Sequence, residues 1–102
     1  MIINTTYVVE AAAAQHFIDY LREFYIPKAT ATGLLTFPRL SRILREGDPE
    51  EGISIALQFS SQSNDHYLEW HDERGQKLAR MLTNKFGHSV VGFTTYMEEI
   101  EL

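Results

Sequence analysis

The chain has 102 residues, of which 44% are hydrophobic and 12% aromatic, as in ordinary globular domains rather than disordered chains. It contains no cysteine, which excludes disulfides and thiolate chemistry and fits a reducing cytoplasm. Nine basic against fourteen acidic residues give a net charge of -5, with no basic block, so neither nucleic acid nor an anionic membrane is an expected partner. The sequence shows no bilayer-spanning run and no signal peptide, so we expect one cytoplasmic domain, residues 1–102.

The first third of the chain predicts a strand followed by a helix. Residues 2–9 are rich in β-branched and aromatic types, which favour strands. Over residues 11–26 apolar side chains recur every three or four positions, which predicts an amphipathic helix. Pro27 lacks an amide hydrogen and is expected to stop or kink this helix. A short helical turn then ends at Gly33, which is free to take the left-handed cap conformation.

The middle of the chain predicts two strands joined by a loop. Residues 34–45 predict the second strand, and Pro38 places it at an edge of the sheet because proline cannot donate to a neighbouring strand. Residues 46–52 contain two glycines, one proline and four acidic residues, which indicates a loop. Residues 53–61 alternate strictly between apolar and polar or small side chains, which predicts the third strand.

The last third predicts a longer helix and a fourth strand. Helix residues 65–86 follow capping side chains and end at Gly87, and residues 89–97 predict the strand. The resulting order, β-α-β-β-α-β, is that of the ferredoxin-like α+β fold, a four-stranded antiparallel sheet with both helices on one face. In the first, third and fourth predicted strands the other sheet face carries no charge, so we expect a second copy of the chain to cover it in a homodimer.

Two stretches of sequence resemble a family of short bacterial proteins of unknown function. The first combines Glu23-Phe24-Tyr25-Ile26-Pro27 with Ala31-Thr32-Gly33-Leu34-Leu35-Thr36 and Pro38-Arg39-Leu40. The second is Lys85-Phe86-Gly87 followed by Val90-Val91-Gly92-Phe93-Thr94-Thr95. The resemblance implies a dimeric α/β barrel, in which two ferredoxin-like sheets face each other. That superfamily includes antibiotic-biosynthesis-type monooxygenases, haem-degrading enzymes, stress-responsive dimers and amino-acid-sensing modules, so it implies no single function.

The second predicted helix carries a candidate ligand site. His71 falls in the middle of its apolar arc and is expected to be buried, and Gly75 follows on the same arc one turn later. A buried imidazole beside a missing side chain predicts a notch for a small molecule between this helix and the sheet. Tyr67 and Trp70 flank the notch, and Arg74 could anchor a carboxylate there. The alternative is a packed core, with His71 bonded to a backbone carbonyl and Arg74 extending past the rim.

The superfamily suggests a second combination of residues. Its haem-degrading branch uses an Asn on the first strand together with a Trp and a helix His, and this chain has Asn4, Trp70 and His71. The residue types agree with that site, whereas the spacing does not match it, since Trp70 and His71 are adjacent.

A third combination could bind a metal ion. His66, Glu69 and Glu73 share one outward helix face with spacing that could coordinate a metal, although an exposed acidic face would look the same. We therefore expect no metal and no cofactor.

No phosphate-binding glycine loop, dinucleotide fingerprint or nucleophile elbow is present, which favours binding over catalysis. The sequence therefore predicts an uncharacterised homodimer that binds a small molecule. A cofactor-independent monooxygenase or haem-handling enzyme, and an interaction module without a ligand, remain the alternatives.

Overall fold

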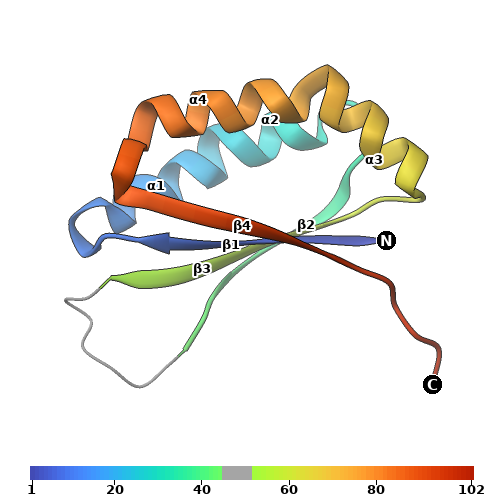
Figure 1. Cartoon of the computed structure of the whole chain (residues 1–102), viewed down its shortest axis with the longest axis horizontal. Helices are drawn as coiled ribbons and strands as arrows, with labels where there is room; N and C mark the ends of the chain where they lie inside the picture. Colours follow the sequence, from blue (N-terminus) through green and yellow to red (C-terminus); the bar gives the residue numbers. More distant parts are fainter. Residues whose placement is uncertain (45–51) are drawn as a thin grey trace.

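Four antiparallel strands form one sheet, and the helices cover one of its two faces (Figure 1). The structure, a computed structural model, describes residues 1–44 and 52–102. The strand order is β2-β3-β1-β4, so the first strand lies between the third and fourth. The strands are β1 Ile2–Val9, β2 Thr36–Arg42, β3 Ile53–Ser60 and β4 Val90–Met97. This confirms the expected ferredoxin-like α+β fold, with strand limits within a few residues of the predicted ones.

Two long helical stretches connect the strands, and each contains one wider turn with π-type hydrogen bonding. The first stretch begins with a 3₁₀ turn and continues through α1 Ala14–Tyr20, a first π-turn at Leu21–Tyr25, and α2 Ile26–Thr30. The second consists of α3 Asn64–Trp70, a second π-turn at His71–Gly75, and α4 Gln76–Phe86. Such turns carry one extra residue and often occur at functional sites.

Pro27 does not end the first helix, so of the two expected outcomes, a stop or a kink, the stop does not occur. The helix continues to Thr30, and Gly33 then takes the expected left-handed conformation, with φ of +79°. A proline ring inside an α-helix clashes with the carbonyl four residues earlier, here that of Glu23. That carbonyl lies in the first π-turn, where the backbone is wider, and we attribute the continuation of the helix to this extra room.

The second π-turn changes which side of the second helix is buried. The buried positions are Tyr67, Trp70, Gly75, Leu78 and Leu82, so one step of five residues replaces the usual three or four. A helical wheel with a constant angle per residue therefore assigns residues to the wrong side of the helix across this turn, because the turn holds one extra residue. Two apolar residues of this helix that a regular helical wheel would place on its buried side, Leu68 and Met81, are 47% and 37% exposed.

Alternation along the strands separates the core from an open sheet face. The side chains of β1 and β3 that face the helices form the centre of the core, as the alternation predicted: Ile3, Tyr7, Val9, Ile55, Leu57 and Phe59. The opposite face has no helix over it (Figure 1). Its central residues, here called the open sheet face, are Ile2, Asn4, Thr6, Val8, Ala56, Gln58, Val91, Phe93, Thr95 and Met97. They carry no charge.

Strand β2 lies at a sheet edge, which confirms the position inferred from Pro38. Its pairing with β3 shifts between Thr36 and Arg39, and Phe37 at this irregularity has a positive φ of 51° and is 77% exposed. Most of the predicted loop at 46–52 lies outside the described residues. Within the described ranges, no helix is both long and apolar enough to cross a membrane.

Candidate ligand cavity between the second helix and the sheet

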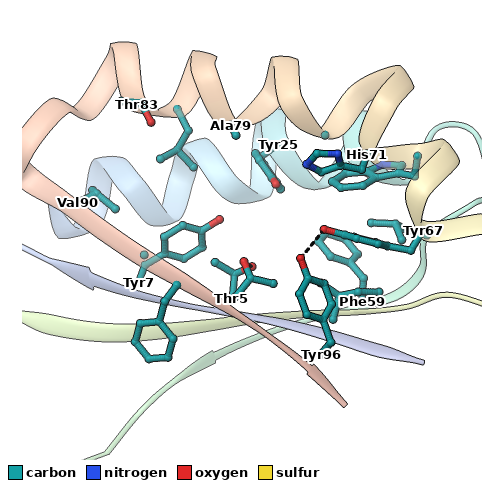
Figure 2. A pocket seen from close by; sticks show the side chains of 18 residues that line it. Thr5, Tyr7, Tyr25, Phe59, Tyr67, His71, Ala79, Thr83, Val90 and Tyr96 are labelled. Carbon is teal, nitrogen blue, oxygen red and sulfur yellow. Dashed lines mark hydrogen bonds between the residues drawn. The ribbon is translucent and has the colours of Figure 1, made fainter. Parts of the chain in front are cut away.

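A cavity of about 340 Å³ lies between the sheet and the helices. It is lined by residues of β1, β3 and β4, of both π-turns, and of α3 and α4. Each π-turn contributes at its C-terminal end, through Tyr25 from the first and Gly75 from the second. Figure 2 shows labelled side chains from the helices and the sheet, among them Tyr7, Tyr25 and Tyr67, directed into the shared space. The volume is within the range of small-molecule sites.

Small side chains leave the space open between α4 and β4. Along the helix Gly75, Ala79 and Thr83 follow one another at intervals of four, so they lie on one side of it. Opposite them, β4 contributes Gly92 and Thr94, again at alternate positions that face the helices. Larger side chains at these positions would close the gap, so the residue sizes explain why a slot exists there.

Two glycines allow aromatic rings to form the cavity walls. A Cβ at Gly75 would lie 2.5 Å from the ring of Trp70, and a Cβ at Gly92 would lie 2.8 Å from the ring of Tyr7. Neither distance is tolerated by a real side chain, so each ring depends on the glycine next to it. The position of the Trp70 ring therefore explains why a glycine occurs in the middle of this helix at position 75.

We expect Gly75→Ala to lower the free energy of unfolding by about 1–2 kcal/mol. The new methyl group would force the Trp70 ring to move, which as overpacking costs about 1–3 kcal/mol, while alanine returns up to about 1 kcal/mol of helix propensity. Urea unfolding measures the difference. Gln76→Ala, one exposed residue further on, is the control and should change stability by less than about 0.5 kcal/mol. A Gly75→Ala protein more stable than the parent would contradict this packing.

Four tyrosine hydroxyls converge on the cavity. Figure 2 shows the hydroxyls of Tyr7, Tyr25, Tyr67 and Tyr96 directed into the space between helices and sheet. The Tyr67 and Tyr96 hydroxyls are hydrogen bonded at 3.0 Å. Burial raises the pKa of Tyr25 to about 12. Burial, followed by the proximity of Tyr25, raises the pKa of Tyr7, and burial followed by the bond to Tyr96 raises that of Tyr67. These three phenols therefore remain neutral at physiological pH.

His71 lines the cavity but is not buried, contrary to the expectation from the helical wheel. Its side chain is 41% exposed, and its Nδ1 lies 3.8 Å from the Asp72 carboxylate, which is itself largely exposed. The second π-turn begins at His71, so the ring is rotated away from the centre of the buried side. The notch inferred from His71 and Gly75 is present as part of the cavity, with His71 at its margin.

Trp70 and Arg74 both bond to the end of α2. The Trp70 indole lies on the cavity wall and donates from Nε1 to the carbonyl oxygen of Ala29 at 2.8 Å, while Arg74 donates to the carbonyl oxygen of Lys28 at 3.4 Å. The last carbonyls of an α-helix lack the usual amide partner four residues on, so Trp70 satisfies that of Ala29, while that of Lys28 accepts from the Ala31 amide as well as from Arg74. Arg74 does not line the cavity. Its expected role as an anchor for a carboxylate ligand is therefore wrong for this cavity.

Asn4 lies on the other side of the sheet from the cavity. Its neighbours Ile3 and Thr5 face the cavity, so by strand alternation Asn4 belongs to the open sheet face, where it donates to Thr6 at 3.1 Å. Within one chain, the structure does not bring Asn4 together with Trp70 and His71. The combination of residues that resembled the haem-degrading enzymes is therefore not assembled here.

The helix face with His66, Glu69 and Glu73 remains exposed. The Ser63 hydroxyl accepts from the backbone amide of His66 and also lies 2.6 Å from its ring Nδ1, so this histidine belongs to the cap of α3. Among residues 1–44 and 52–102, no three histidine or acidic side chains gather closely enough to hold a metal ion.

Residues 1–100 match the family described as a domain of unknown function (DUF4286). The chain belongs to this family. That confirms the resemblance to short proteins of unknown function. A search of the curated proteins found no match.

Solved structures similar to this DUF4286 protein share its fold. They include an ethyl tert-butyl ether d (EthD) family protein from Bacillus halodurans C-125, with 11% identity, a TM-score of 0.68, and coverage of 96% of this chain and 100% of that chain. A dimeric ferredoxin-like protein from an uncultured marine organism has 12% identity, a TM-score of 0.65 and coverage of 100% and 99%. HapK from Hahella chejuensis has 7% identity, a TM-score of 0.62 and coverage of 100% and 97%. At such identities the likeness shows the fold alone.

The sequence reasoning missed the tyrosines of this DUF4286 protein that come from other elements. Tyr7 and Tyr25 were assigned to core strand and helix positions, and Tyr96 to the last strand. The available signal was chemical: four of the five tyrosines in the chain line one cavity, and a buried tyrosine hydroxyl needs a hydrogen-bond partner that phenylalanine would not require. Only tertiary structure could show that the four hydroxyls meet.

Proposed function

We propose that this DUF4286 protein is a homodimeric domain, residues 1–102, which binds a small molecule in the cavity between the second helix and the sheet. One observation carries the proposal: buried tyrosine hydroxyls converge on a cavity of about 340 Å³ that small residues keep open toward solvent. A protein that needed only a packed core would gain stability by filling this space. The polar groups favour a function in binding over a purely structural one.

The lining residues favour binding over catalysis. Within the described residues the lining contains no carboxylate, lysine or arginine, so His71 is its one ordinary acid-base group. His71 lies at the margin, and its Nδ1 is close to Asp72. Two of the lining threonines, Thr5 and Thr94, bond to each other at 3.0 Å rather than to a base that would activate a nucleophile.

The open sheet face supports the dimer. Val91 and Phe93 on this face are 65% and 61% exposed, next to Val8 at 42%. Contiguous uncharged surface of this kind usually marks an interaction site. A second copy would cover it by packing sheet against sheet, and a neighbour of the same fold is described as dimeric.

Removing the bound molecule should lower the melting temperature of natively purified protein. A ligand that binds only the folded state adds about 3 kcal/mol of stability when its concentration is a hundred times the dissociation constant. The comparison is between protein purified natively and protein unfolded, dialysed and refolded. We expect the native preparation to melt several degrees higher, and a solvent extract of it to contain a small molecule by absorbance and mass spectrometry.

The variant Ala79→Phe is designed to fill the gap between α4 and β4. Ala79 lines the cavity and is also exposed to solvent, so the larger side chain can be introduced without disturbing the core. It should abolish the difference in melting temperature between the two preparations. Arg80→Phe places the same side chain one position further on, away from the cavity, and should preserve it. Equal melting temperatures of the native and refolded parent protein, with no extractable molecule, would contradict the proposed function.

A further inference from the structure

The lining of the cavity also restricts what can bind there. Of the eighteen lining residues none is Asp, Glu, Lys or Arg. The lining includes one histidine, His71, whose Nδ1 lies 3.8 Å from the carboxylate of Asp72, a residue outside the lining. A charged ligand would lose its hydration in the cavity without gaining an opposite charge, and such a transfer is strongly unfavourable. The occupant is therefore uncharged.

The hydroxyls define which neutral groups the cavity recognises. Each tyrosine hydroxyl carries one proton to donate. In the pair Tyr67–Tyr96 one proton bridges the two oxygens and the other stays free for a further acceptor. The hydroxyls of Tyr7 and Tyr25 point into the same space (Figure 2). The lining has no carboxylate or side-chain amide to accept these protons. A ligand oxygen that can only accept hydrogen bonds, such as a carbonyl oxygen, would therefore accept them.

Size and shape restrict the ligand further. The volume of about 340 Å³ corresponds to roughly ten water-sized groups. The opening is a slot, with Gly75, Ala79 and Thr83 on one side and Gly92 and Thr94 on the other. A flat ring system fits between two such walls, and the aromatic rings of Tyr7, Tyr67 and Trp70 offer surfaces against which it can pack.

We infer that the cavity binds an uncharged, flat molecule of one or two rings whose carbonyl oxygen accepts hydrogen bonds from the converging tyrosine hydroxyls. This rests on the proposed function, because it specifies the ligand class of the same cavity. Tyr67 and Tyr96 supply one free donor, and Tyr7 and Tyr25, whose hydroxyls interact with each other, supply a second. The aromatic walls provide the apolar contact.

Four bicyclic probes of similar size separate the chemical classes: 1-tetralone with a carbonyl, naphthalene without one, anionic 1-naphthoate and cationic 1-naphthylmethylammonium. Binding to the refolded, ligand-free dimer is followed by amide NMR. The chain has only six glycines, and two of them, Gly75 and Gly92, line the cavity, so their amide signals report binding locally. We expect 1-tetralone to shift both signals and to bind at least tenfold more tightly than the other three probes.

Removing a donor should remove the preference. Tyr67→Phe combined with Tyr96→Phe should weaken 1-tetralone binding five- to tenfold and leave naphthalene binding unchanged, as expected for one neutral hydrogen bond. Tyr96→Phe alone, at a 55% exposed position, should change the affinity much less, because the Tyr67 hydroxyl then keeps its own proton for the ligand. Tyr20→Phe is the matched control, because the buried Tyr20 hydroxyl has no hydrogen-bond partner among the described residues and does not line the cavity.

The result that overturns the inference is tighter binding of naphthalene or of a charged probe, or a 1-tetralone affinity that the double variant Tyr67→Phe with Tyr96→Phe leaves unchanged. No binding of 1-tetralone also overturns it. The proposed function fails by a different result, the absence of a retained molecule and of any effect of Ala79→Phe on the melting temperature. The two failures are therefore distinguishable.

Discussion

Val91→Glu is expected to convert the dimer into monomers at micromolar concentration. Val91 lies on the open sheet face beside Val8, its partner in the pairing of β4 with β1. In a dimer that packs sheet against sheet, the two-fold axis duplicates the substitution, so each interface loses two valines and buries two carboxylates. Unpaired carboxylates in an apolar interface cost several kcal/mol, which corresponds to a dissociation constant raised on the order of a hundredfold or more.

Light scattering across a dilution series measures this change. Leu68→Glu is the matched control, because Leu68 is an exposed apolar residue, 47% accessible, on α3 at the helix side of the molecule. It should leave the dissociation constant unchanged. A parent protein with the mass of one chain, 11.7 kDa, at micromolar concentration would contradict the dimer itself. A Val91→Glu protein as dimeric as the parent would show that a different surface forms the contact.

Stability should fall steeply at alkaline pH. Burial raises the folded-state pKa of Tyr7 and of Tyr25 above the ordinary value for a tyrosine, about 10, that of Tyr25 to about 12. The unfolded chain therefore releases these protons first, and the stabilisation is complete below pH 10 and lost as the pH rises toward the folded-state values. Each unit above pH 10 costs about 1.4 kcal/mol per buried tyrosine, or about 3 kcal/mol for the pair at about pH 11.

Urea unfolding at about pH 8, 10 and 11 measures this loss, and phenolate absorbance follows the ionisation directly. Tyr7→Phe and Tyr25→Phe should each reduce the alkaline loss by about 1.4 kcal/mol at about pH 11, even where they change stability at neutral pH. A free energy of unfolding that stays constant from pH 8 to 11 in the parent protein would mean that neither hydroxyl is buried as the structure has it.

The elements of the fold could be predicted because the local signals agreed with one another. Alternation in residues 53–61 specified both the strand and its buried face, and Gly87, with φ of +55°, ends the second helix where expected. The edge position of β2 followed from Pro38 alone. Each of these features depends on residues close together in the sequence.

The details of the site depended on features without a local signal. The second π-turn shifts the buried side of the helix by one residue, which placed His71 at the cavity margin and Trp70 against Gly75. Asn4 was assigned to the correct strand. The candidate site, however, required its side chain to face the helices, whereas strand alternation places it on the open sheet face. The meeting of Tyr7, Tyr25, Tyr67 and Tyr96 brings together two strands and two helices, which only the tertiary structure shows.

Native mass spectrometry of gently purified protein tests the central claim, that the cavity holds a small molecule. We expect a dimer carrying up to one small molecule per chain. The extra mass should disappear in Ala79→Phe, where the slot is blocked, and persist in Arg80→Phe. A parent protein with no extra mass, or an extra mass that Ala79→Phe retains in full, would contradict the account.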